Sequence, residues 1–156
     1  MKRWLCAIGI FLPIWSSAQD EKIVCRENGT QLELNQCAAD DFARADNELN
    51  QVWKQILSKY CDRPLFLKKL KASQLLWLQF RDAELEAKFP YDKSENPRYE
   101  YGSVFPMCWA MYKAQLTVAR VKDLKVWLVG EAQEGDVCQG SVKMSADLQS
   151  IKNVSK

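Results

Sequence analysis

The chain has no histidine among its 156 residues. This absence excludes Ser/His and Cys/His nucleophilic catalysis and nearly all protein zinc sites, because both depend on an imidazole. The sequence also lacks alternation of apolar and polar residues strong enough to predict a β-sheet, and it has no internal repeat. We therefore expect no metal centre and no cofactor, and the fold class that we predict is all-α.

No apolar run in the chain is long enough to span a bilayer, including the one near its start. There, Lys2 and Arg3 precede a largely apolar segment, Trp4–Trp15, and the small residues Ser16-Ser17-Ala18 follow. This order is typical of a secretory signal peptide, and we predict that residues 1–18 form one, cleaved after Ala18. An uncleaved anchor is the alternative. The predicted location is the periplasm or the extracellular medium.

The segment that remains after this cleavage has no net charge. The whole chain has a formal net charge of +2, and residues 1–18 carry two basic and no acidic side chains. The remaining 138 residues suffice for one domain with a hydrophobic core. A neutral surface argues against nucleic acid or an anionic membrane as the main partner, so we predict no nucleic-acid binding and no stable membrane insertion.

Three long helices are predicted from local signals and hydrophobic periodicity. Thr30-Gln31-Leu32-Glu33 has the pattern of a capping box, from which a first helix extends to about Lys59. Pro64 suits the first turn of a second helix, over residues 64–88, and a third helix extends over residues 103–128.

The periodicity also predicts which residues these helices bury. For the first helix they are Phe42, Ala45, Leu49, Val52, Trp53, Ile56 and Tyr60. For the second helix they are Leu67, Leu70, Gln74, Trp77, Arg81 and Leu85. For the third helix they are Phe105, Trp109, Tyr112, Leu116, Ala119 and Leu124.

A short link at residues 60–63 joins the first two helices, and we expect them to form an antiparallel hairpin. With the third helix they form an antiparallel three-helix bundle, stapled by disulfides, in a domain that we place at residues 19–129. A long loop separates the second helix from the third. Residues 130–156 are predicted to be a polar, irregular C-terminal extension, with a short helix near residues 146–151.

Export favours disulfides for the five cysteines that follow the signal peptide. In an up-down-up bundle Cys25, Cys37 and Cys108 lie at one end, and Cys61 and Cys138 lie at the other. The two ends are on the order of 30 Å apart, which excludes a disulfide between Cys61 and Cys108. We predict the disulfides Cys25–Cys37 and Cys61–Cys138, with Cys108 free. The alternative pairs Cys25 or Cys37 with Cys108.

One face of the second helix carries polar residues at helical spacing, and inward-facing Gln74 and Arg81 need polar partners. Asp46 lies at a similar height in the bundle and is expected to accept hydrogen bonds from Arg120 or Arg81. The predicted polar layer consists of Asp46, Asn50, Gln74, Trp77, Arg81 and Arg120. We interpret it as a salt-bridge network that fixes helix register. A carboxylate–arginine catalytic site is the alternative, but no nucleophile or set of metal ligands accompanies it, so we predict no catalytic residue.

The same residues carry a resemblance to a known family. The motif Gln74-x-x-Trp77-x-x-x-Arg81-Asp82 is preceded by Asp46-x-x-Leu49-Asn50 and followed by Gly102-Ser103 and Thr117-x-x-Arg120. In this order and at these spacings the motifs resemble the LprI-type lysozyme inhibitor family, also known as a domain of unknown function in many bacterial envelope proteins. The resemblance covers about residues 25–128. It implies a small exported helical protein that binds and inhibits a lysozyme or another peptidoglycan hydrolase.

The loop at residues 89–103 is the predicted contact surface for such a partner. Exposed tyrosines on a loop are good anchors for another protein, and an acidic loop can oppose the basic rim of a glycan-cleaving cleft. The expected contact residues are Tyr91, Asp92, Glu95, Tyr99, Glu100 and Tyr101. Packing of the tyrosines against the end of the bundle is the alternative.

Three other functions are compatible with this sequence. They are an immunity protein against a toxin delivered to the envelope, a carboxylate-based glycan hydrolase, and a structural component of the envelope. Glu84 and Glu86 suggest the carboxylate pair of a glycosidase, but a spacing of two places them on different faces of a helix. We therefore predict a binding protein and not an enzyme.

Overall fold

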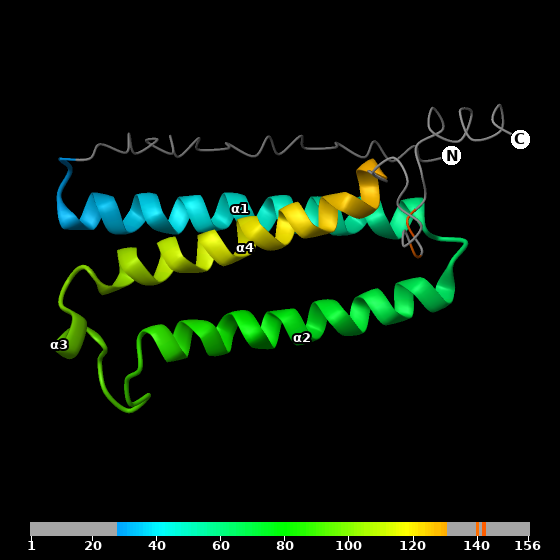
Figure 1. Cartoon of the computed structure of the whole chain (residues 1–156). Helices are drawn as coiled ribbons and strands as arrows, with labels where there is room; N and C mark the ends of the chain where they lie inside the picture. The colour runs from blue at the N-terminus through cyan, green and yellow to red at the C-terminus, as the bar shows by residue number, and fades with distance from the viewer. Residues whose placement is uncertain (1–27, 131–139, 141, 143–156) are drawn as a thin grey trace, which may run out of the picture.

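The computed structural model describes residues 28–130, 140 and 142, and most of these are helical. Within them the helices are, in chain order, α1 (Gln31–Lys59), α2 (Pro64–Lys88), α3 (Arg98–Tyr101) and α4 (Phe105–Val129). The described ranges contain no strand, so the all-α prediction is confirmed. Figure 1 shows α1 and α4 running in one direction and α2 running in the other.

Sequence signals at the helix ends act as predicted. The Thr30 hydroxyl accepts a hydrogen bond from the Glu33 amide at 3.3 Å, and the Glu33 carboxylate accepts one from the Thr30 amide at 2.7 Å. This is the capping box, which satisfies two amides that the first turn of α1 leaves unpaired. Pro64 begins α2, where a missing amide costs nothing. α4 is capped at its C-terminal end by Gly130, whose φ of 65° lies in the left-handed region that favours glycine.

The end of α1 satisfies the end of α4. The last carbonyl groups of a helix have no partner within it and attract cations. Lys59 Nζ donates to the carbonyl oxygens of Trp127 at 3.1 Å and Leu128 at 2.7 Å, and the Tyr60 hydroxyl donates to that of Trp127 at 2.9 Å. These contacts hold the C-terminal ends of the two parallel helices together.

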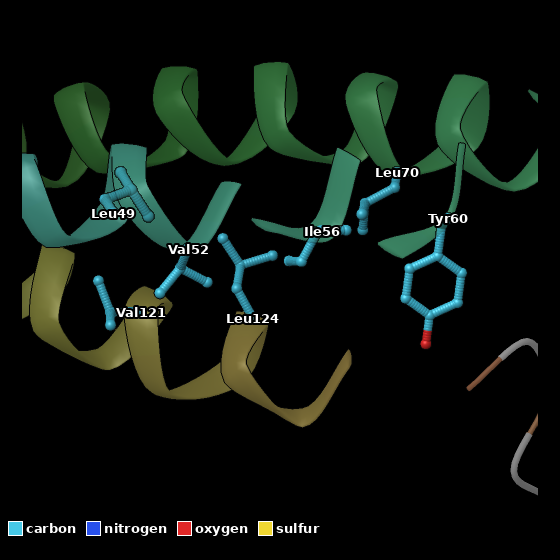
Figure 2. Packing of buried hydrophobic residues seen from close by; sticks show 7 residues of the cluster. All are labelled: Leu49, Val52, Ile56, Tyr60, Leu70, Val121 and Leu124. Atoms are coloured by element: carbon cyan, nitrogen blue, oxygen red, sulfur yellow. The ribbon is translucent and has the colours of Figure 1, made fainter. Parts of the chain in front are cut away.

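The hydrophobic core lies mainly between α1 and α4 (Figure 2). Its fully buried members include Ile56 and Tyr60 of α1 and its C-cap, and Leu124 of α4. The Tyr60 ring also lies 4.5 Å from the Phe66 ring and 6.5 Å from the Trp127 ring, measured between centroids. The cluster consists of Leu49, Val52, Ile56, Tyr60, Leu70, Val121 and Leu124.

The predicted buried stripes are confirmed on α1 and α2 and partly wrong on α4. The expected residues that are buried on the first two helices, or at the end of α1, are Ala45, Leu49, Val52, Ile56, Tyr60, Leu70, Arg81 and Leu85. On α4 Leu124 is buried as predicted, but Ala119 is exposed, and Thr117 and Val121 are buried instead. α4 has apolar residues around most of its circumference, so periodicity alone does not select its buried face.

α2 lies apart from the pair formed by α1 and α4. The backbones of α1 and α4 come close along much of their length, whereas α2 approaches α4 at few points and α1 at fewer (Figure 1). Large side chains such as Trp77 and Phe66 fill the space on the inner side of α2. The predicted closed three-helix bundle is therefore not confirmed, because periodicity identifies the inner face of a helix but not its distance from its neighbours.

The predicted disulfide between Cys61 and Cys138 is not formed. Cys61 is an exposed free cysteine, and Cys108 is a half-buried free cysteine. Cys37 is buried and disulfide-bonded, and its partner lies outside the described residues, since the other two described cysteines are free. The Cys25–Cys37 pairing stays a prediction, because Cys25 lies outside these residues.

Other predictions also fall outside the part of the chain that the structure describes. They concern the signal peptide at residues 1–18, and the C-terminal extension apart from residues 130, 140 and 142. Among the helices that are described, none is both long and apolar enough to cross a membrane.

We expect the core between α1 and α4 to dominate stability. Replacing Ile56 with alanine leaves a cavity in a fully buried site and should lower the free energy of unfolding by about 2–4 kcal/mol. The matched control is Leu57→Ala at the neighbouring, exposed position, which should cost less than about 1 kcal/mol. Urea unfolding followed by circular dichroism measures both, and equal losses would contradict this location of the core.

Candidate functional site

The polar layer is built around Trp77 of α2. The guanidinium carbons of Arg81 and Arg120 lie 5.4 and 5.7 Å from the centroid of the Trp77 ring, within the range of cation–π attraction. Gln74, one turn earlier on α2, accepts a hydrogen bond from Arg120 Nε at 3.0 Å. This group links α2 to α4 through a side-chain amide and an aromatic ring.

Both arginines of this layer have unused donors. Arg81 is only 7% exposed, and its Nε and Nη2 each lie 3.0 Å from Asp82 Oδ1, while its buried Nη1 has no described partner. Arg120 Nη2 is likewise buried with no described partner. Burial lowers the pKa of Arg120, although the nearby charge of Asp123 opposes the shift. The layer therefore holds excess positive charge.

The expected ion pair of Asp46 with Arg81 or Arg120 is not formed. Asn50 Nδ2 instead donates to the Asp46 carbonyl oxygen at 2.9 Å and to its carboxylate at 3.1 Å. The physical reason is the separation of α1 and α2, which leaves a hollow of about 350 Å³ with Asp46, Asn50 and Gln74 on its walls. The six residues of the predicted layer thus fall into two groups, one on α1 and one between α2 and α4.

Neither group contains a cluster of possible metal ligands. The described residues contain no group of three or more Cys, Asp and Glu side chains placed to hold a metal ion. The two candidate glycosidase carboxylates have separate neighbours, since Glu84 accepts from the Tyr112 hydroxyl at 3.4 Å and Glu86 pairs with Lys93 at 2.9 Å. This arrangement does not favour the hydrolase alternative.

A loop with an aromatic interior joins α2 to α4. We call it the aromatic loop (residues 89–104), and it includes the single turn α3, although no helix was predicted there. Five rings pack together at its base, with centroid separations between 5.5 and 6.2 Å. They form what we call the aromatic cluster: Phe89, Tyr91, Tyr101, Phe105 and Trp109.

Two of the three loop tyrosines belong to this cluster and are structural. Tyr101 stacks on Phe105 at 5.6 Å, and its hydroxyl donates to the Pro90 carbonyl oxygen at 2.7 Å. Desolvation raises the pKa of Tyr101, and the negative charge of Glu100 adds to the shift. Tyr91 lies edge-on to Phe105 at 5.8 Å. Of the two expectations for the loop tyrosines, packing against the helix ends therefore applies to Tyr91 and Tyr101.

Tyr99 is the exception, because it is 87% exposed on the α3 turn. The turn is followed by Gly102, whose φ of 71° lies in the left-handed region that favours glycine. The expected contact residues are therefore of two kinds. Those that project into solvent are Asp92, Glu95, Tyr99 and Glu100.

Short hydrogen bonds order the polar part of the loop. The Asp92 carboxylate accepts from the amide of Ser94 at 2.8 Å and from its hydroxyl at 2.7 Å, and these bonds lower the pKa of Asp92. The hydrogen bond and charge of Glu86 raise the pKa of Lys93. Asp92 is therefore charged at neutral pH, and the charge of Lys93 is compensated.

The sequence contained a signal for the aromatic cluster that was missed. Tyr101, Phe105 and Trp109 follow one another at steps of four, which is the spacing of side chains that stack along one side of a helix. Phe105 and Trp109 were predicted only as buried residues of the last helix. Together with Tyr101 they form the support on which the loop lies.

Comparison with known families covers both parts of this site. The family profile described as "Lysozyme inhibitor LprI" matches residues 25–124, which include the polar layer and the aromatic loop. The chain belongs to the lysozyme inhibitor LprI family. The resemblance stated from the sequence motifs is confirmed.

Other comparisons add little about activity. An uncharacterized protein of Rhizobium meliloti (strain 1021) is 30% identical over 122 residues, which cover 70% of this chain and 82% of that protein. No solved structure gives a significant match to the chain. The fold and the site of this LprI family member are therefore described from its own residues.

We expect Gln74 to contribute to stability through Arg120. A Gln74→Ala variant leaves the half-buried Arg120 Nε without its acceptor and should lower the free energy of unfolding by about 1–3 kcal/mol. The matched control is Gln79→Ala, at an exposed position of the same helix, with an expected change within about 0.5 kcal/mol. Thermal melts of the two variants side by side make the measurement. An unchanged melting temperature for Gln74→Ala would exclude this role.

Proposed function

We propose that the protein is an exported inhibitor of a lysozyme or a related peptidoglycan hydrolase. Membership of the lysozyme inhibitor LprI family supports this proposal. The family match includes every residue of the aromatic loop. In this proposal residues 1–18 are a cleaved signal peptide, residues 19–129 are the inhibitory domain and residues 130–156 are an extension. The protein acts in the periplasm or outside the cell by binding, and it catalyses no reaction itself.

The observation that supports the aromatic loop as the binding surface is the exposure of Tyr99. The Tyr99 ring is exposed to water in the free protein, so its burial in a partner would remove a large apolar surface from water. Buried aromatic residues contribute much of the binding free energy of many interfaces. The aromatic cluster beneath it fixes the loop before binding, which lowers the entropy lost on association. Tyr99 is thus placed to enter a cleft with little rearrangement.

Charge on the loop supports the same partner. Asp92, Glu95 and Glu100 are exposed carboxylates of the loop, which also exposes Arg98, while the ammonium group of Lys93 is paired with Glu86. A cationic hydrolase with a basic rim around its cleft would meet these carboxylates first, and long-range attraction would raise the association rate. Tyr91 and Tyr101 contribute by holding the loop in place, and we no longer expect them to be direct anchors.

The proposal predicts a large effect of one substitution. Tyr99→Ala removes the exposed anchor without touching the aromatic cluster, so inhibition should fall by roughly tenfold or more at unchanged melting temperature. The measurement is the rate of lysis of bacterial cell walls by animal-type and bacterial lysozymes, with increasing amounts of the protein that begins at residue 19.

The matched control is Leu32→Ala, another highly exposed side chain on the first turn of α1, which should leave inhibition unchanged. If Tyr99→Ala inhibits as well as the parent protein, the aromatic loop is not the binding surface. If the parent protein inhibits no lysozyme, the proposed function itself is wrong.

A further inference from the structure

The hollow between α1 and α2 has polar walls that the proposed inhibition does not use. Its volume of about 350 Å³ is at the small end of the range for ligand pockets. Its polar side chains are those of Asp46 and Asn50 on α1 and of Lys71 and Gln74 on α2. Its apolar side chains are those of Leu49 and Trp53 on α1 and of Leu75 and Leu78 on α2. A few polar groups between apolar walls are typical of sites that bind small molecules.

The α1 wall of the hollow offers hydrogen-bond acceptors. Asn50 Nδ2 already donates to the carbonyl oxygen and to the carboxylate of Asp46, at 2.9 and 3.1 Å. The side-chain oxygen of Asn50 and the remaining lone pairs of the Asp46 carboxylate can accept from further donors. No basic side chain of the described residues forms an ion pair with Asp46. This wall therefore suits a positively charged donor.

The α2 wall offers hydrogen-bond donors. Gln74 Oε1 accepts from Arg120 Nε at 3.0 Å, so the amide N–H groups of Gln74 are the ones that have no described partner. Lys71 adds an ammonium group, which makes no ion pair with the described residues. Residues 64–80 of α2 include no acidic side chain that could neutralise it from a neighbouring turn. This wall therefore suits a negatively charged acceptor.

We propose that the hollow binds a dipeptide that has apolar side chains and free ends. Its ammonium group donates to Asp46 and Asn50, and its carboxylate accepts from Lys71 and Gln74. Its side chains lie against the leucines and the tryptophan of the two walls. Opposite charges on opposite walls are complementary to the two ends of a zwitterion, and each contact is a charge-assisted hydrogen bond.

Other small ligands match these walls less well. The hydroxyl groups of a neutral sugar donate and accept alike, so they make no use of the separation of donors from acceptors, and they bring no charge to Asp46 or Lys71. A free amino acid carries both charges on one carbon atom, whereas the two walls belong to different helices. A dipeptide moves its ends apart by one further residue, which is about 3.8 Å.

The hollow is separate from the surface proposed for inhibition. Asp46 and Gln74 lie in the middle of their helices, whereas the aromatic loop follows the end of α2. Asn50, Lys71 and Leu75 are exposed, so the charges of a bound peptide remain partly solvated. We therefore expect a dissociation constant on the order of 100 µM. Binding is measured without a hydrolase, so its outcome does not depend on the proposed function.

The first test asks whether both ends of the peptide are recognised. Calorimetric titration of the chain from residue 19 with the dipeptide Leu-Leu should show one site. Acetyl-Leu-Leu, which lacks the ammonium group, and Leu-Leu amide, which lacks the carboxylate, should each bind at least about tenfold more weakly. Absence of Leu-Leu binding up to about 5 mM would overturn the proposal. So would equal binding of the three peptides, or tighter binding of N-acetylglucosamine than of Leu-Leu.

The second test assigns each end of the peptide to its wall. Asp46→Asn should weaken binding of Leu-Leu by at least about tenfold and leave that of acetyl-Leu-Leu unchanged. Lys71→Gln should weaken Leu-Leu in the same way and leave Leu-Leu amide unchanged. The matched controls are Glu48→Gln and Lys68→Gln, whose positions on the same two helices lie outside the walls of the hollow.

Both control variants should bind Leu-Leu like the parent protein, and circular dichroism checks that every variant is folded. If a folded Asp46→Asn variant binds Leu-Leu like the parent, or loses affinity for Leu-Leu and acetyl-Leu-Leu equally, Asp46 does not hold the ammonium group and the proposed site is wrong. The same conclusion follows if a control substitution weakens Leu-Leu as much as the substitution of its partner on the wall.

Discussion

The contact between α1 and α4 is the interaction on which the rest of the structure depends. Tyr60 is central to it, because its ring is fully buried and lies close to Phe66 and Trp127, and its hydroxyl satisfies a carbonyl at the end of α4. Lys59 completes the same end. The Tyr60 hydroxyl and the Lys59 side chain thus replace the water that would otherwise bind the final carbonyls, and they join the ends of α1 and α4. α4 in turn begins with the two rings that support the loop.

α2 is held differently, by side chains that reach the other helices rather than by close approach of the backbones. Phe66 packs against Tyr60 and Trp127 at one end, and Phe89, just after α2, packs against Phe105 and Trp109 at the other. Between them the Trp77 ring contacts the two guanidinium groups. Aromatic rings and arginine side chains are long, so they connect helices without bringing the backbones together. The hollow between α1 and α2 is the consequence, and the unpaired guanidinium nitrogens lie in the layer that spans from α2 to α4.

The sequence allowed the three long helices and two of their buried faces to be predicted, but not α3, because caps and periodicity are local properties. The Thr30 capping box, Pro64 and buried Arg81 are examples. The distance between helices is not local. The absence of the Asp46 ion pair follows from an arrangement that depends on how side chains fill space. The loop sequence has no periodicity that distinguishes its packed tyrosines from the exposed one. The steps of four from Tyr101 to Trp109 cross a helix boundary, so the periodicity of a single helix does not reveal them.

The exposed apolar groups of this protein have two different physical origins, and the difference bears on how they can be used. Tyr99 is a single ring held away from a rigid base, which suits insertion into a concave partner. α2 also exposes Leu65, Leu76 and Phe80 on the side opposite its buried residues. These side chains keep apolar area in contact with water, whereas the rings beneath Tyr99 are packed against one another.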